Sequence, residues 1–413
     1  MSAPSCVLIA IGGGKGGVGK SMIAANLAVA MAQGGRQTVL VDGDLGSPNL
    51  HSLLGIDKVH KTVESLLNKE VDQLDDVKTP TAVPNLSLVA GSAAAVGSAN
   101  IPHLQKQKLL RHIAQLQADA VIVDVGAGTS FNTLDLFNVA DVRVIVTTPQ
   151  LTALQNAYAF AKSATYRELR SLAQGKEQLE LLEDPRLSKD GAKLTQLVAH
   201  VRAKQPFFAA ALREALDARR LFVVGNQVLE EKDANVFHAF VRMVKDFLSV
   251  DCEVLGQLRS SRRAHDSVNR RRPLLVDEAS TDFALTFRRM ADRVLNLNVA
   301  QMREARHRAE ERAAEGHTEQ PPAPLPADLE VYSRTSKRRE PGAMAMLDGQ
   351  TVIVQDVTQD GALVTSDHKL EIGARHVLVM SDGKTMSVEI RSAKEGGVYG
   401  AMFVERARKA AGQ

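Results

Sequence analysis

One glycine-rich stretch near the N-terminus constrains the fold more than any other part of the chain. It reads GGGKGGVGKSM from Gly12 to Met22, between an apolar run of strand length and an alanine-rich helical stretch. Glycines let backbone N–H groups turn inward around a polyphosphate, and the N-terminus of the following helix adds partial positive charge. A loop of this composition between a strand and a helix therefore predicts a phosphate-binding site.

The loop contains two lysines where phosphate binding requires only one. Lys20 is expected to reach the β- and γ-phosphates of a nucleotide, and the Ser21 hydroxyl to be a ligand of Mg²⁺. The expected nucleotide-binding residues are Gly14, Lys15, Gly16, Gly17, Val18, Gly19, Lys20, Ser21 and Met22.

Apolar runs of strand length alternate with helical stretches over the first two thirds of the chain. The expected strands are Val7–Ile11, Thr38–Asp42, Leu86–Gly91, Ala120–Val125, Val142–Thr148, Leu221–Asn226 and Glu253–Leu258. Continuous apolar strands separated by helices predict an α/β fold, with a mainly parallel sheet covered by helices on both faces. The alternation breaks over about 163–219, which is rich in Leu, Ala, Glu and Lys and predicts inserted helices of unassigned role.

The length of 413 residues suggests two or three domains. A proline-rich segment, PPAPLP, indicates a linker at 313–330. We therefore expect the domain with the phosphate-binding loop over 1–312 and a small all-β barrel or sandwich over 331–413, where short strands alternate with turns. The two cysteines, Cys6 and Cys252, form no CxxC pair and fit a reducing cytoplasm. We recognise neither a signal peptide nor a membrane-spanning run, so the expected location is cytoplasmic.

The string KGGVGKS (Lys15–Ser21) resembles the deviant Walker A motif of the MinD/ParA class of P-loop ATPases. This resemblance implies an ATP-dependent homodimer with two ATP molecules held between the subunits. Lys15 would then reach across the interface to the nucleotide of the partner subunit. A cation that arrives only on dimerisation would stabilise charge developing on the phosphate oxygens.

Later segments resemble the same class in the same order. VLVDGDLGSPNLHSLLG resembles its switch I, which implies that Asp44 positions the attacking water and that Asp42 lies near the magnesium ion. VIVDVGAGTS resembles its Walker B and switch II region, in which Asp124 would hold a magnesium-bound water. The backbone of Gly126 and Gly128 would sense the γ-phosphate. The implied catalytic residues are Lys15, Lys20 and Asp44, and the implied metal site is Ser21, Asp42 and Asp124.

Asn226, in VVGNQV, stands where the family contacts adenine. The alternative interpretation is that Asn226 is simply a turn residue at the end of a strand. The turn after the last strand, LRSSRRAHD, lacks the Pro-x-Asp signature usual in the family. The strings SVNRRRPLL and AGTSFNTLDLFNVAD resemble the FlhG (FleN, YlxH) branch of flagellar-number regulators. This branch implies a flagellar or polar assembly factor as protein partner, and a polar location.

A basic cluster follows that strand; its members are Arg259, Arg262, Arg263, Arg270, Arg271 and Arg272. Such a cluster fits a solvated helix face, non-specific DNA contact, or peripheral contact with acidic lipid or an acidic partner. No aromatic residues are interleaved with the arginines, so stacking on bases is not expected.

The C-terminal strands resemble a PilZ domain, a family that binds cyclic di-GMP. The matching motif would be Asp356, Thr358 and Gly361, with the arginine pair Arg334 and Arg338 upstream. Guanidinium groups suit a phosphate-rich dinucleotide. A degenerate barrel that binds protein is the alternative.

Together these features predict an ATPase switch that controls the placement or number of a cellular machine, most simply flagella. Two alternatives stay open: a DNA-riding partition or cargo-positioning ATPase, and a cyclic di-GMP-responsive binding protein with ATP as a dimer clamp. An iron–sulfur carrier would need a pair of cluster-ligating cysteines, for which Cys6 and Cys252 are not placed.

Overall fold

The computed structural model describes the chain in several stretches. These are residues 6–44, 46–91, 102–183, 193–278, 280–314, 343–348, 350–357, 361–366, 368, 370–379, 385–394 and 398–403. The chain divides into two compact units. The first comprises Met1–Ser171, Asp217–Ala234 and Val250–Arg308, and the second comprises Leu172–Leu216, Asn235–Ser249 and Ala309–Gln413.

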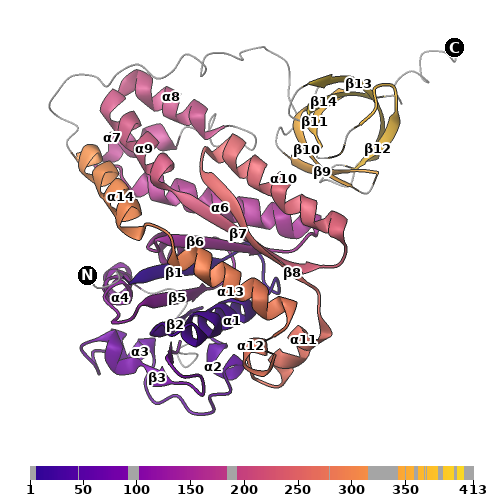
Figure 1. Ribbon diagram of the computed structural model, residues 1–413. Coiled ribbons are helices and arrows are strands. Elements are labelled where there is room, and N and C mark those ends of the chain that lie inside the picture. Colours follow the sequence, from indigo (N-terminus) through magenta and orange to yellow (C-terminus); the bar gives the residue numbers. More distant parts are fainter. Residues whose placement is uncertain are drawn as a thin grey trace, which may run out of the picture. The chain divides into compact units, whose positions relative to one another are not determined.

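The first unit is built on an eight-stranded sheet (Figure 1). Its strands are β1 (Val7–Gly12), β2 (Thr38–Gly43), β3 (Thr79–Pro80), β4 (Leu86–Val89), β5 (Ala120–Val125), β6 (Val142–Thr147), β7 (Arg220–Val228) and β8 (Asp251–Arg259). The order across the sheet is β3-β4-β2-β5-β1-β6-β7-β8, and every pairing is parallel except that of β3 with β4. The seven predicted strands are confirmed, and the short edge strand β3 was missed.

Helices surround this sheet. They are α1 (Lys20–Gln33), α2 (Leu50–Leu53), α3 (Val63–Leu67), α4 (His103–Ala114), α5 (Phe131–Asn138), α6 (Leu151–Ser171), α11 (Arg262–Asn269), α12 (Leu274–Asp277), α13 (Asp282–Leu295) and α14 (Val299–Ala314), with a 3₁₀ turn at Leu74–Val77. Helix α10 (Glu231–Leu248) begins in the first unit, but most of its residues belong to the second. Strands β1, β2, β5 and β6 are buried along their whole length, as expected for a sheet covered on both faces.

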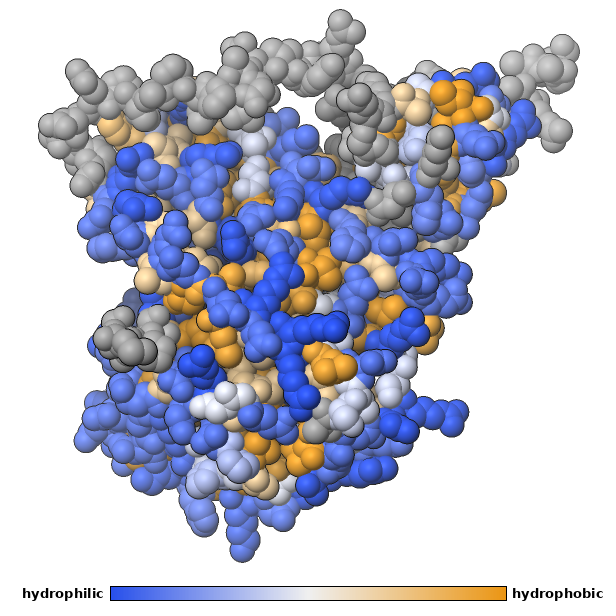
Figure 2. All heavy atoms as spheres, in the orientation of Figure 1, coloured by the Kyte–Doolittle hydropathy of each residue, from blue (hydrophilic) through white to orange (hydrophobic). Residues whose placement is uncertain are grey.

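The core of the first unit is largely aliphatic. Helix α1 is buried on almost every side, and α13 packs Phe287, Met290 and Val294 into the same core. Around α3, hydrophilic residues predominate on the face shown in Figure 2. No helix in the described part of the chain has the length and apolar character needed to cross a membrane.

The inserted segment is helical, as predicted over 163–219. Helix α6 continues without a break to Ser171, so the separate helices begin only at α7 (Lys176–Leu182), followed by α8 (Leu194–Lys204) and α9 (Pro206–Ala218). The residues of α6 up to Leu169 keep one buried face, which explains why the helix extends beyond the expected boundary.

The C-terminal strands close into a small antiparallel barrel in the order β10-β11-β14-β13-β12-β9. Its strands are β9 (Ala343–Leu347), β10 (Gln350–Val357), β11 (Gly361–Thr365), β12 (Arg375–Val379), β13 (Thr385–Lys394) and β14 (Val398–Phe403). Alternate residues of neighbouring strands, such as Val352, Val354 and Val364, fill the interior. A small β domain is thereby confirmed, whereas its PilZ type stays a prediction.

The motif expected to bind cyclic di-GMP is described only in part. Asp356 lies in β10 and Gly361 begins β11. Arg334, Arg338 and Thr358 lie outside the described residues, as does the linker from residue 315 onward. Helix α14 ends at Ala314, within the predicted linker.

Candidate nucleotide-binding site

The glycine-rich loop joins the end of β1 to the start of α1. Gly17 and Gly19 have φ angles of 80° and 98°, in the left-handed region that glycine adopts at little cost. A Cβ on Gly14 would lie 1.9 Å from the carbonyl oxygen of Asn156 in α6, so only glycine allows this approach. The sequence between β1 and α1 therefore specifies both the backbone path of the loop and its packing on α6.

The two lysines of the loop have different surroundings. Lys15 is exposed, whereas Lys20 is only 8% exposed and its Nζ donates to the carbonyl oxygen of Lys15 at 3.4 Å. Burial lowers the pKa of Lys20, and the nearby Asp124 and Asp44 carboxylates oppose that shift. The structure thus places one cation inside the loop and leaves the other pointing to solvent.

Asp124, near the end of β5, is 2% exposed and accepts a hydrogen bond from the Ser21 side chain. Its Oδ1 atom is buried and has no hydrogen-bond partner among the described residues. Burial, with a smaller contribution from the neighbouring Asp42 carboxylate, raises the pKa of Asp124 to about 7. A buried carboxylate oxygen without a partner, beside a serine hydroxyl, fits a hard cation such as Mg²⁺, which prefers oxygen ligands.

Asp42 stands opposite Asp124 in the register of β2 and β5. Its carboxylate accepts the backbone N–H groups of Asn49 and Leu50, both at 3.0 Å, and of Asp44 at 3.3 Å. Burial raises its pKa to about 7 despite these hydrogen bonds. Asp42 therefore organises the loop that leads into α2, a role that the sequence did not indicate.

No group of three or more His, Cys, Asp or Glu side chains in the described stretches could by itself hold a metal ion. A magnesium ion here would thus depend on Ser21, Asp124, phosphate oxygens and water, as P-loop sites commonly do. Its proposed contact with Asp42 stays a prediction.

Asp44 lies where the two expected switch segments meet. Its Oδ1 accepts the N–H groups of Gly46 at 3.2 Å and Ser47 at 3.1 Å. A Cβ on Gly126 would lie 3.2 Å from the Asp44 carboxylate, and Gly128 has a φ angle of 93°. The segments expected to be switch I and switch II are thus in close contact at Asp44 and Gly126.

Asn226, in β7, is 5% exposed and its Nδ2 donates to the Val18 carbonyl oxygen at 2.9 Å. A Cβ on Gly19 would lie 2.3 Å from the same Nδ2. Asn226 therefore supports the loop directly, across 208 residues of sequence. The expected adenine contact stays a prediction.

The basic cluster is exposed throughout, but half of it is already used in ion pairs. These pairs join Arg263 to Glu278 at 3.3 Å, Arg271 to Asp57 at 2.7 Å and Arg272 to Asp277 at 2.9 Å. Such pairing reduces the charge that these three arginines offer to a polyanion.

The two cysteines do not form a disulfide. Cys252 is buried in β8, whereas Cys6 is partly exposed just before β1. Burial raises the pKa of the Cys6 thiol, although Arg303 opposes the shift.

Residues 6–168 match the ParA family model, described as NUBPL iron-transfer P-loop NTPase. The flagellum site-determining protein YlxH of Helicobacter pylori is 35% identical over 159 residues, which are 37% of this chain and 52% of the relative. The septum site-determining protein MinD of the same organism is 30% identical over 152 residues, 37% of this chain and 56% of the relative. The chain thus spans about half the length of the curated relatives it matches.

Among solved structures, MinD from Pyrococcus horikoshii has a TM-score of 0.47 and 18% identity, over 70% of this chain and 96% of that one. A MinC:MinD cell division complex from Aquifex aeolicus has a TM-score of 0.49 and 19% identity, over 71% and 97%. The motifs, the parallel sheet and the match over residues 6–168 agree with one another, and this part of the chain is similar to P-loop NTPases of the ParA and MinD type.

Proposed function

We propose that this chain is an ATP-hydrolysing molecular switch that dimerises when ATP binds. The observation that carries the proposal is the buried pair of Lys20 and Asp124 beside Ser21, at the mouth of a glycine-rich loop. An ammonium and an unbonded carboxylate oxygen are costly to bury unless a ligand of high charge completes the site. A nucleotide triphosphate with its metal ion meets that requirement.

Each residue has a distinct task in this proposal. Ser21 and Asp124 hold the magnesium ion, which neutralises charge on the phosphate oxygens. Lys20 stabilises the β- and γ-phosphates, and Asp44 orients the attacking water. Lys15, exposed on the loop, reaches the nucleotide of the partner subunit.

The proposed output is the placement or number of a cellular machine. Similarity to a flagellum site-determining protein favours flagella, although the similarity spans only about half of that relative. The proposed location is the cytoplasm, with recruitment to the membrane periphery or a cell pole by a flagellar or polar assembly factor. We propose the C-terminal barrel as the regulatory module, with cyclic di-GMP as the ligand that its PilZ resemblance implies.

The test combines nucleotide binding with oligomeric state. Lys20→Ala should abolish binding of a fluorescent ATP analogue, while the exposed-lysine control Lys58→Ala should bind normally. Asp44→Ala should bind ATP and accumulate as a dimer in light scattering after gel filtration. Micromolar binding by Lys20→Ala would refute the loop assignment, and a monomeric Asp44→Ala protein at saturating ATP would refute the dimer.

A DNA-riding ATPase is the second candidate, favoured by exposed members of the basic cluster for which the described residues show no ion pair. These are Arg259, Arg262 and Arg270. Replacing all three by Gln should abolish ATP-dependent, salt-sensitive DNA binding if this candidate is correct. Absence of DNA binding by the unmodified protein in 50 mM salt would exclude it.

An iron-transfer role, the activity in the description of the matching family model, has less support. Cys252 is buried, and it does not form a metal-ligating group with other His, Cys, Asp or Glu side chains in the described residues.

A further inference from the structure

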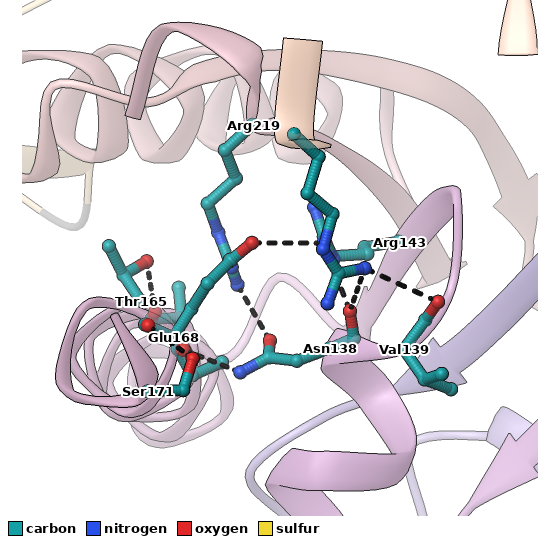
Figure 3. A network of polar contacts seen from close by, with 10 residues as sticks. Asn138, Val139, Arg143, Thr165, Glu168, Ser171 and Arg219 are labelled. Carbon is teal, nitrogen blue, oxygen red and sulfur yellow. Dashed lines mark hydrogen bonds and ion pairs between the residues drawn. The ribbon is translucent and has the colours of Figure 1, made fainter. Parts of the chain in front are cut away.

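A buried polar network lies where the interior strands β6 and β7 begin, at the end of the sheet opposite the nucleotide loop (Figure 3). Its members are Asn138, Arg143, Glu168, Arg219 and Arg306. They come from the end of α5, the start of β6, the residue before β7, α6 and α14. The network thus joins parts of the chain that are far apart in sequence.

Charged groups dominate this network. Arg219 is 1% exposed and Arg143 is 4% exposed, and both form ion pairs with Glu168. Arg219 also donates to the Asn138 side-chain oxygen at 3.1 Å. Burial lowers the pKa of Arg143 to about 9 and lowers that of Arg219 as well, so Arg143 still carries its charge at neutral pH.

The remaining positive charge of the network is directed at the C-terminus of α5. The Asn138 carbonyl oxygen accepts from Arg143 at 3.0 Å and from Arg306 at 3.1 Å. Arg306 also donates to the Val139 carbonyl oxygen at 3.5 Å. The last carbonyls of a helix carry partial negative charge and lack partners within the helix, so guanidinium groups stabilise them.

Residues 138–141 connect α5 to β6. Helix α14 contacts this connection a second time through Arg303, one helical turn before Arg306. Arg303 pairs with both carboxylate oxygens of Asp141, at 2.7 and 2.6 Å, and also donates to the Cys6 carbonyl at 2.8 Å. Asp141 in turn accepts the N–H of Leu8 in β1 at 2.9 Å. Residues three apart share one helix face, so Arg303 and Arg306 together clamp α14 to the connection 138–141.

The other end of α5 begins at switch II. Ser130, two residues after Gly128, is its N-cap and accepts the Thr133 N–H at 3.2 Å. A helix of this length spans about 12 Å. It is braced midway by the bidentate pair of Arg167 with Asp135, at 2.7 and 3.0 Å. This pair ties α5 to α6, so a shift at switch II that moves this short helix reaches the connection 138–141 at its other end together with α6.

We propose that α14 is a strap, a helix whose attachment to the connection 138–141 depends on the nucleotide that is bound. When switch II closes on the γ-phosphate, α5 moves the connection 138–141 and changes how firmly Arg303 and Arg306 hold α14. Because α14 is the last described helix before the barrel in the sequence, its release or retention is the signal passed toward the C-terminal module. The inference rests on the proposed function, since it requires nucleotide to reach switch II.

The test is hydrogen–deuterium exchange of the full chain without nucleotide, with ADP and with ATP, all in the presence of Mg²⁺. In the unmodified protein, we expect the exchange rate of peptides covering 299–314 to differ at least threefold between ADP and ATP. Equal α14 exchange in all three states, with peptides over 12–22 protected by ATP, would overturn the strap and leave the proposed function intact. No protection of peptides over 12–22 would overturn both.

A matched pair of variants separates the clamp from general helix stability. Arg306→Gln should exchange rapidly over α14 in both nucleotide states while ATP still protects the loop. Arg308→Gln, whose partner is Glu304 on the same exposed helix face, should keep the wild-type difference. A retained ADP–ATP difference in Arg306→Gln would overturn the proposed role of the clamp, and the nucleotide comparison in the unmodified protein stands even if that variant folds poorly.

Discussion

Glu168→Gln should strongly destabilise the first unit, because Glu168 carries the negative charge that balances two buried guanidinium groups. The substitution keeps the size of the side chain and one oxygen acceptor but removes the charge. Arg219 and Arg143 would then remain buried beside an amide, with Asn138 as the nearest acceptor.

The magnitude follows from the contacts. Breaking a buried ion pair by removing one partner costs about 3–5 kcal/mol. Counting instead two hydrogen bonds to charged groups at about 1.5–3 kcal/mol each gives about 3–6 kcal/mol. Because the Gln oxygen still accepts one of these bonds, we expect a loss of about 3–4 kcal/mol in the free energy of unfolding. With an m-value of about 2 kcal/mol/M, the urea midpoint falls by about 1.5–2 M.

The assay is urea unfolding, followed by exchange or limited proteolysis of peptides from α5 and α6. The control is Glu304→Gln, which removes the exposed pair with Arg308 and should cost about 0.3–0.5 kcal/mol. A midpoint shift for Glu168→Gln below about 0.5 M would refute the reasoning. The double variant Glu168→Gln/Arg219→Gln should be no less stable than the single one, since it removes one of the uncompensated charges.

Three further outcomes follow from the nucleotide site. Gly14→Ala should abolish ATP binding because its Cβ would meet the α6 backbone, whereas Gly175→Ala, outside the loop and with open space around the added carbon, should bind as before in a titration. Asn226→Ala should weaken ATP binding about 5- to 10-fold, the equivalent of one hydrogen bond of about 1–1.4 kcal/mol supporting the loop. Because burial raises the pKa values of Asp42 and Asp124 to about 7, the folded protein binds more protons than the unfolded chain between about pH 4 and 7. Its free energy of unfolding without nucleotide should therefore fall as pH rises through that range, and Asp124→Asn should make the slope shallower; an unchanged slope would contradict the assigned burial.

The sequence was most informative where one local pattern decides the structure. Apolar runs that alternate with helical stretches located seven strands; four of these are buried along their whole length, whereas the edge strand β8 is only partly buried. The loop is equally local, since the left-handed conformations of Gly17 and Gly19 require no distant partner. The small barrel followed from short alternating strands with turns between them.

Features that depend on distant partners were not predictable. The arginine network joins Asn138 to Arg306, 168 residues apart, and each arginine alone reads as an ordinary surface residue. Likewise, the support of the loop by Asn226 and the use of Asp42 to order the α2 loop arise from packing across the sheet. Strand β3 has two residues, one of them proline, and is too short to leave a periodic signal.

Gly126 and Asp44 are in close contact, so the two loops that contain them, about 80 residues apart in sequence, are packed against each other. A Cβ at position 126 would crowd the Asp44 carboxylate, which would have to shift by a few tenths of an ångström, so the position of one loop affects the other. In the proposed switch, detection of the γ-phosphate and readiness for hydrolysis are then one coincident event rather than two successive ones. The proposed switch is then complete only when both loops are in place, and the rate of switching is set by the slower of the two loops.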